Sequence, residues 1–229
     1  MNLKFFVKFI SVLAVLGLLL MYVTPVLAVE PTPPVIHSPA VILIESGTGR
    51  VLYERNMHER RYPASITKVM TAIIVLEELE LDEIITISSE VVDTIRPGYA
   101  SASLLEGEEL TAYQLLNLIM VVSANDAANA LAKHISGSIE EFAVLMTTRA
   151  RELGMNNTNF MNPSGLHHAN HYSTAYDLAL LGIYALQNST LRRISGTPLF
   201  VLPATNMTET PRNFHNTNLL LLPQSSRKS

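Results

Sequence analysis

Ser65 and Lys68 are the residues in this sequence whose types and spacing best suit nucleophilic chemistry. They lie three positions apart, and in a helix that spacing places two side chains on one face, about one turn apart. A serine hydroxyl is a weak nucleophile until a base takes its proton, and a lysine can act as that base when burial lowers its pKa. Because Val69 and Met70 follow directly, we expect Lys68 to be shielded from water.

A purely structural interpretation is that Ser65 caps a helix and Lys68 lies on the surface, since Ser-x-x-Lys occurs by chance in many proteins. A second pair of polar residues, Ser123 and Asn125, favours a catalytic role for Ser65 and Lys68 over a purely structural one. It follows the almost wholly apolar stretch 111–122, and a helix of that kind is normally buried in the middle of a domain. Ser123 could pass a proton to a leaving amine, and the Asn125 amide could hold a substrate carbonyl.

On these residues the sequence resembles the serine D-alanyl-D-alanine carboxypeptidases, which are low-molecular-weight penicillin-binding proteins with S-x-x-K, S-x-N and K-T-G signatures. The resemblance runs from about Ala40 to Leu220. It is carried by Pro63-Ala-Ser-Ile-Thr-Lys-Val-Met-Thr71, Ser123-Ala-Asn-Asp-Ala-Ala128, Glu152-Leu-Gly-Met155, Asn162-Pro-Ser-Gly-Leu166, His171-Tyr-Ser-Thr174 and Asn216-Thr-Asn218.

The resemblance implies a role for each matched residue. Ser65 would form the acyl ester, Lys68 would be the general base, and Ser123 with Asn125 would form the second catalytic element. It also implies an α+β fold shared with serine β-lactamases, in which a helical cluster packs on an antiparallel sheet with strands from both ends of the chain. The implied substrate is a peptidoglycan stem peptide ending in D-Ala-D-Ala, with β-lactam antibiotics as inhibitors and no cofactor.

One family motif is not found. K-T-G should lie on a strand beyond the Asn-Thr-Asn segment, but the sequence ends eleven residues after Asn218 without it, and Arg193-Ile-Ser-Gly196 is a poor substitute. We therefore expect a catalytic domain that lacks its C-terminal strands. We also expect an impaired enzyme, because that strand would supply a cation for the substrate carboxylate and an oxyanion-hole donor, whose loss costs about 10²–10³ in rate.

Two other functions remain open. A β-lactamase would share Ser65, Lys68 and Ser123, but class A enzymes deacylate through a glutamate, and no Asp or Glu lies between Gly154 and Tyr176. A non-catalytic protein could keep the fold and bind penicillin or wall peptides without turnover.

Two further polar features suggest structural roles rather than chemistry. His167, His168 and His171 share a loop without Cys or a carboxylate, so we expect no metal site and a role in loop structure. Asp126 is expected to serve the dipole of the helix that it begins.

Helices and a hairpin must position these residues. Apolar residues recur at three- and four-residue steps after Ser65, and the pairs Ser138/Glu141 and Thr174/Asp177 are typical helix starts. The predicted elements are a β-hairpin over 40–54 and helices from Ser65, over 111–122, from Ser138 to Gly154, and from Thr174 to about Leu186, with a long loop over 155–173.

The N-terminus predicts export. Lys4 and Lys8 precede the apolar run 9–23, and Val26-Leu27-Ala28 provides a cleavage pattern, so residues 1–28 indicate a signal peptide, with an uncleaved membrane anchor as the alternative. We expect a proline-rich linker over 29–39, one catalytic domain over 40–222 and an unstructured tail over 223–229.

Composition limits the partners. Without residues 1–28 the net charge is −6, which gives no indication of a nucleic-acid partner, whereas contact with a membrane surface remains possible. The chain contains no Cys, so burial of the core, and no disulfide, must stabilise the exported domain.

Overall fold

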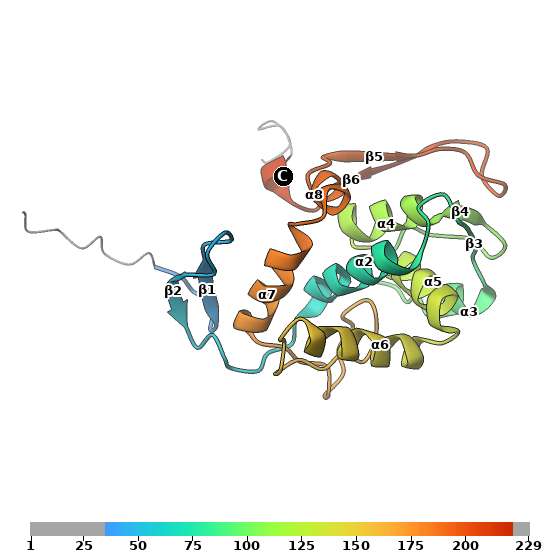
Figure 1. Cartoon of the computed structure of the whole chain (residues 1–229). Helices are drawn as coiled ribbons and strands as arrows, with labels where there is room; N and C mark the ends of the chain where they lie inside the picture. The colour runs from blue at the N-terminus through green and yellow to red at the C-terminus, as the bar shows by residue number, and fades with distance from the viewer. Residues whose placement is uncertain (1–34, 222–229) are drawn as a thin grey trace, which may run out of the picture. The chain divides into compact units, whose positions relative to one another are not determined.

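In the computed structural model, which describes residues 35–221, helix α4 (Ala112–Val121) forms where the sequence predicts a buried apolar helix. Most of its side chains are buried and none is exposed. It contacts α2 (Thr67–Glu78), α5 (Asn125–Ser136) and α8 (Ser189–Ser195), as Figure 1 shows. Because it presents apolar side chains on every face, α4 can only be stable at the centre of the helical cluster.

The other helices cover this centre. Helix α6 (Ile139–Glu152) packs on α5 and α2, α7 (Ala175–Ala185) packs on α2, and the short α3 (Ser89–Asp93) packs on α5. Two 3-10 turns, η1 (Ala64–Ile66) and η2 (Leu219–Leu221), complete the helical elements of residues 35–221. The fully shielded core includes Met70, Ile74, Leu115, Leu116, Leu118, Leu131, Phe142 and Met146.

The strands form three separate antiparallel pairs within the described residues. Strands β1 (Val41–Ile44) and β2 (Val51–Arg55) confirm the predicted hairpin, with Val41 opposite Arg55. The other pairs are β3 (Ile84–Thr86) with β4 (Glu109–Thr111), and β5 (Leu199–Leu202) with β6 (Arg212–His215).

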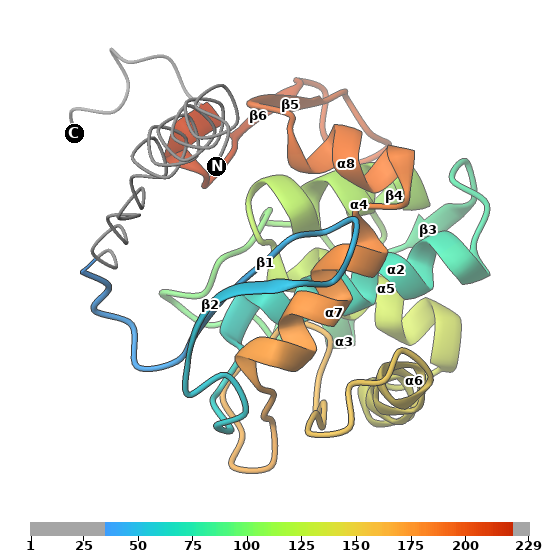
Figure 2. The same ribbon diagram turned by 60° about the vertical axis from the view of Figure 1, so that its left-hand side comes forward.

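The N-terminal and C-terminal strands do not share a sheet in residues 35–221, in contrast to the arrangement that the resemblance implies. The reason is visible in Figures 1 and 2: the β1–β2 hairpin lies on α7, whereas the β5–β6 hairpin lies on α4. Each hairpin is therefore held by a different helix.

Helix starts follow the predicted capping residues, with one difference. Ser138 accepts a hydrogen bond from the Glu141 N–H (3.1 Å), and Thr174 accepts one from the Asp177 N–H (3.1 Å). The Asp177 carboxylate, however, turns away from the cap and accepts hydrogen bonds from Thr158 Oγ1 at 2.7 Å and from the N–H of Asn157 at 2.8 Å. It thus ties α7 to the 155–173 loop.

Several predictions concern segments that the structure assigns differently or does not describe. Arg193-Ile-Ser-Gly196 lies at the end of helix α8, with the Arg193 guanidinium 5.6 Å from the Tyr113 ring centre, so it is not a strand. The signal peptide, most of the linker and the 223–229 tail lie outside the described residues. Within residues 35–221, no helix is long and apolar enough to cross a membrane.

An ion pair with a buried carboxylate joins the β5–β6 hairpin to the segment that precedes β4. Glu108, which is 0% exposed, pairs with Arg212 of β6 and also accepts a hydrogen bond from Thr205 Oγ1 (2.8 Å). Its second oxygen accepts from the N–H of Leu105 (3.0 Å). Glu108 therefore needs Arg212 as its compensating charge.

We expect Arg212→Ala to lower the free energy of unfolding by about 3 kcal/mol, because a buried carboxylate left without its cation is strongly destabilising. Urea denaturation measures the change. Arg192→Ala, at an exposed position of α8, is the control and should cost less than about 0.5 kcal/mol. Equal costs for the two variants would show that the Glu108 pair contributes nothing specific.

Candidate active site

Ser65 lies at the start of α2. It belongs to the 3-10 turn η1, which runs directly into α2, and it is exposed. The preceding residue, Ala64, has φ of +48°, a left-handed conformation that non-glycine residues rarely adopt. A hydroxyl here is open to a substrate and lies at the positive end of a helix dipole.

Lys68 lies one turn further along α2 and is buried, as its apolar neighbours predict, with 2% of its surface exposed. Its Nζ is 3.5 Å from Ser65 Oγ, 2.7 Å from Asn125 Oδ1 and 2.8 Å from the carbonyl oxygen of Ser164. Burial lowers the pKa of Lys68 to about 8, and the negative charge of Asp126 opposes this by raising it. The predicted desolvation is therefore found.

Ser123 and Asn125 lie at the junction of α4 and α5. Ser123 has φ of +61°, and its Oγ is buried with no hydrogen-bond partner among the described residues. Asn125 is the first residue of α5, and its Oδ1 accepts from Lys68. The structure thus joins Ser65, Lys68 and Asn125 through one amine, whereas Ser123 lies two residues from Asn125 in the chain and makes no hydrogen bond to that amine within the described residues.

The long 155–173 loop also reaches the site, and sequence reasoning assigned none of its residues a part in it. Asn162 Oδ1 accepts from the N–H groups of Ser164 (3.2 Å), Gly165 (2.8 Å) and Leu166 (3.1 Å), which folds these residues into a tight turn. The turn aims the Ser164 carbonyl at Lys68. The matched segment Asn162-Pro-Ser-Gly-Leu166 was the available signal, because Asn, Pro and Gly favour a turn.

At Gly165 the loop closely approaches η1, the turn that contains Ser65. A Cβ placed on Gly165 would lie 1.9 Å from the carbonyl oxygen of Ala64 and 3.0 Å from Thr67 Oγ1. Its φ of +82° is also left-handed. Only glycine allows the loop to approach the residue that precedes Ser65 so closely.

Gly165→Ala is expected to destabilise the fold by more than Gly154→Ala, although both glycines have φ of +82°. At Gly154 the nearest atom to an added Cβ is Leu180 Cδ1 at 3.8 Å, so only the conformational cost of about 1–2 kcal/mol applies. At Gly165 a backbone clash adds to that cost. Urea denaturation of both variants measures the difference, and equal losses would contradict the close contact.

His171 fastens the same loop to α2. Its Nδ1 accepts from the N–H of Met161 at 3.3 Å, so the neutral ring carries its proton on Nε2, which lies 2.9 Å from Thr67 Oγ1. Burial, together with repulsion from His168 and His167, lowers the pKa of His171 to about 4. Within residues 35–221 no group of three His, Cys, Asp or Glu could hold a metal ion.

The His171 pKa predicts a pH dependence of stability. Between pH 6.5 and about 4 the unfolded chain binds a proton that the folded chain does not, so stability is complete above this window and falls with falling pH. The total loss is on the order of 3 kcal/mol. Unfolding free energies at pH 7 and pH 4.5 measure it in the wild type and in two variants.

In these measurements, His171→Gln should reduce the pH dependence of stability, since it removes the titrating ring. The control His215→Gln, at an exposed position of β6, should retain it. An unchanged slope in His171→Gln would contradict the assignment.

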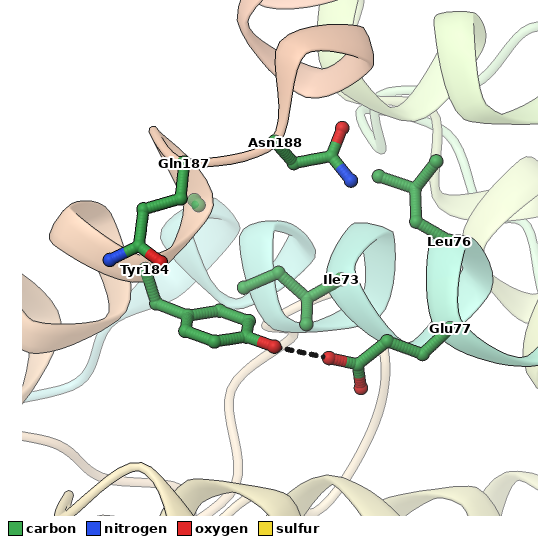
Figure 3. A pocket seen from close by; sticks show the side chains of 7 residues that line it. Ile73, Leu76, Glu77, Tyr184, Gln187 and Asn188 are labelled. Atoms are coloured by element: carbon green, nitrogen blue, oxygen red, sulfur yellow. Dashed lines mark hydrogen bonds between the residues drawn. The ribbon is translucent and has the colours of Figure 1, made fainter.

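A cavity beside α2 is separate from these residues. It has a volume of about 230 Å³ and lies between α2 and the segment that follows α7. Figure 3 shows that Glu77 in its wall already accepts a hydrogen bond from Tyr184 Oη, at 2.8 Å. Arg149 of α6 pairs with the same carboxylate, so this wall joins three helices. None of Ser65, Lys68, Ser123 and Asn125 lines the cavity.

An exposed serine hydroxyl, a buried amine and an amide thus lie together on an α+β helical scaffold. A family model described as D-alanyl-D-alanine carboxypeptidase matches residues 27–227. The chain belongs to this family. The predicted family is thereby confirmed, and solved structures confirm the predicted α+β fold class.

Individual relatives agree with this assignment. The chain is 41% identical to the D-alanyl-D-alanine carboxypeptidase DacF of Bacillus subtilis over 165 residues, which are 69% of this chain and 41% of that protein. It is 36% identical to a D-alanyl-D-alanine carboxypeptidase of Streptomyces, over 86% of this chain and 72% of that protein. The chain spans about two fifths of the length of most curated relatives it matches.

Solved structures show the same fold. The crystal structure of a Streptomyces DD-transpeptidase matches with a TM-score of 0.79 and 33% identity, covering 83% of this chain and 78% of that one. The carboxypeptidase DacD of Francisella tularensis matches with a TM-score of 0.78 and 26% identity, covering 87% of this chain and 60% of that one.

Proposed function

We propose that this chain performs serine acyl transfer on peptides ending in D-Ala-D-Ala, with Ser65 as the nucleophile and Lys68 as the general base. One observation carries the proposal. Lys68 Nζ has three close oxygens, and a neutral amine has two N–H donors and one lone pair. If the two shorter contacts, to Asn125 and Ser164, use the N–H donors, then the lone pair remains for the hydroxyl proton of Ser65.

The reaction then proceeds through an ester. Lys68 takes the Ser65 proton while Oγ forms a bond to the carbonyl carbon of the penultimate D-alanine. The bond from that carbon to the nitrogen of the last D-alanine breaks, and the leaving nitrogen receives a proton. Water subsequently hydrolyses the ester to release the shortened peptide and free Ser65.

Ser123 and Asn125 would act on the leaving group and the substrate. The Ser123 Oγ is buried without a hydrogen-bond partner in residues 35–221. This suits a hydroxyl that relays a proton once a substrate is bound. The Asn125 Oδ1 is already engaged by Lys68, so its NH₂ group is the part that would donate to a substrate carbonyl. Asn125 thereby orients both base and substrate.

The proposed setting is extracytoplasmic. Residues 1–28 predict export, and the peptide end would come from peptidoglycan stem peptides, with β-lactam antibiotics acylating Ser65 as inhibitors. Contact with the membrane surface remains part of this proposal, and a nucleic-acid partner does not.

The β-lactamase and non-catalytic alternatives are less well supported. A class A β-lactamase would need a carboxylate to activate the deacylating water, and the nearby Asp126 is instead occupied by Ser101 Oγ (2.6 Å) and the Ala102 N–H (3.0 Å). A non-catalytic binding protein would not need an amine with a lowered pKa beside an exposed hydroxyl.

Labelled penicillin tests the proposal. We expect Ser65 to be acylated, with a rate that rises with pH through the Lys68 pKa of about 8, because only the neutral amine can accept a proton. Ser65→Ala should abolish labelling. Lys68→Arg should reduce it by about 10² or more, since a guanidinium keeps the charge but cannot act as a base.

The control is Lys133→Arg, a partly exposed position of α5, which should label like the wild type. Peptide mapping must place the label on Ser65, and label on Ser123 would contradict the assignment. Release of D-alanine from a D-Ala-D-Ala peptide separates turnover from binding alone.

A further inference from the structure

Asp126 is buried at the start of α5, immediately after Asn125, and only 1% of its surface is exposed. A carboxylate that merely complements a helix dipole can remain in water, so its burial requires another explanation. Most of the hydrogen bonds that its oxygens accept come from a different part of the chain. The donors are Ser101 Oγ at 2.6 Å, the N–H of Ala102 at 3.0 Å, the N–H of Leu104 at 3.1 Å and the N–H of Ala127 at 3.0 Å.

The segment 100–104 is held from both sides. The N–H of Asn125 donates to the carbonyl oxygen of Ala100 at 2.9 Å, so the segment is fixed to the backbone of Asn125 as well as to the Asp126 side chain. From the opposite side, Arg212 of β6 donates to the carbonyl oxygens of Ala102 and Ser103, at 3.4 and 3.3 Å. The first turn of α5 therefore cannot move without this segment.

We propose that Asp126 is a positioning residue that locks the first turn of α5 to the 100–104 segment and so keeps Asn125 in contact with Lys68. This inference rests on the proposed function of Ser65 and Lys68. The Asn125 contact, at 2.7 Å, is the shortest that Lys68 Nζ makes, and the contact with Ser65 is the longest, at 3.5 Å. A displaced Asn125 would therefore change where the amine points.

Asp126 also affects the base electrostatically. Its negative charge raises the pKa of Lys68, against the larger effect of burial. Arg212, which is paired with Glu108, contacts the 100–104 segment from elsewhere in the chain. On α2 the ring of His171 contacts Thr67, with its pKa lowered to about 4. Removal of the Asp126 charge should thus move the titration of Lys68 to lower pH, which a purely structural role would not do.

The test compares Asp126→Asn, Ser101→Ala and the control Glu140→Gln, which changes an exposed acid in the first turn of α6. The rate of Ser65 acylation by fluorescent penicillin is measured against pH. Asp126→Asn should lower the plateau rate about tenfold or more and shift the profile to lower pH. Ser101→Ala keeps the charge, so it should lower the plateau without a shift, and Glu140→Gln should change neither.

A second readout does not depend on activity. The ammonium group of Lys68 can be titrated by NMR with labelled lysine, assigned by its loss in Lys68→Arg. A Lys68 titration that moves to lower pH in Asp126→Asn and not in Glu140→Gln supports the proposal. It does so even if penicillin labels no serine, because the absence of labelling would overturn only the proposed function.

Two results would overturn the inference. One is a folded Asp126→Asn variant whose Lys68 titration and plateau rate both match the wild type. The other, which applies even if Asp126→Asn does not fold, is a Ser101→Ala variant with an unchanged plateau rate.

Discussion

An amine that is almost completely shielded from water must find hydrogen-bond acceptors within the protein, and the position of Lys68 Nζ depends on this requirement. Asn125 at the start of α5 and the Ser164 carbonyl in the 155–173 loop satisfy it. Each acceptor is in turn held by its own network, through Asp126 and through Asn162. Lys68 Nζ therefore connects the start of α5 to the long loop, and Ser65 lies beside it.

Local patterns predicted much of this arrangement. Apolar periodicity identified α2 and α6, an almost wholly apolar stretch identified α4, and the Thr174/Asp177 pair identified the start of α7. The turn residues between β1 and β2 identified the hairpin. The spacing of Ser65 and Lys68 and the apolar residues after them predicted a buried amine beside a hydroxyl, which the structure contains. Helix α5 was predicted only as the helix that Asp126 begins, and its extent was not, since its buried face consists largely of alanine and asparagine, which give a weak apolar signal.

Contacts between distant parts of the chain could not be predicted in this way. The Ser164 carbonyl is a backbone group, so no residue type marks it as a partner of Lys68, 96 positions away. In the sequence Gly165 is typical of a turn, and only the structure shows its close approach to Ala64. Asp126 and Asp177 both occupy first-turn positions that explain an acid locally, yet both carboxylates bind loops elsewhere in the chain. For Gly165, Asp126 and Asp177 the neighbouring sequence offered a sufficient explanation, so the contact of each with a distant part of the chain was not predicted.

The two opposing influences on the pKa of Lys68 have different structural origins. Burial favours the neutral amine, and it comes from α2 packing against the cluster. The negative charge of Asp126 acts in the opposite direction and raises the pKa of the amine. Asp126 supplies the opposing charge without competing for the amine, since its oxygens are bound to the 101–104 segment and to Ala127. The same hydrogen bonds that fix the start of α5 thus keep the carboxylate close enough to act through its field, while Lys68 Nζ remains directed at Asn125, Ser164 and Ser65.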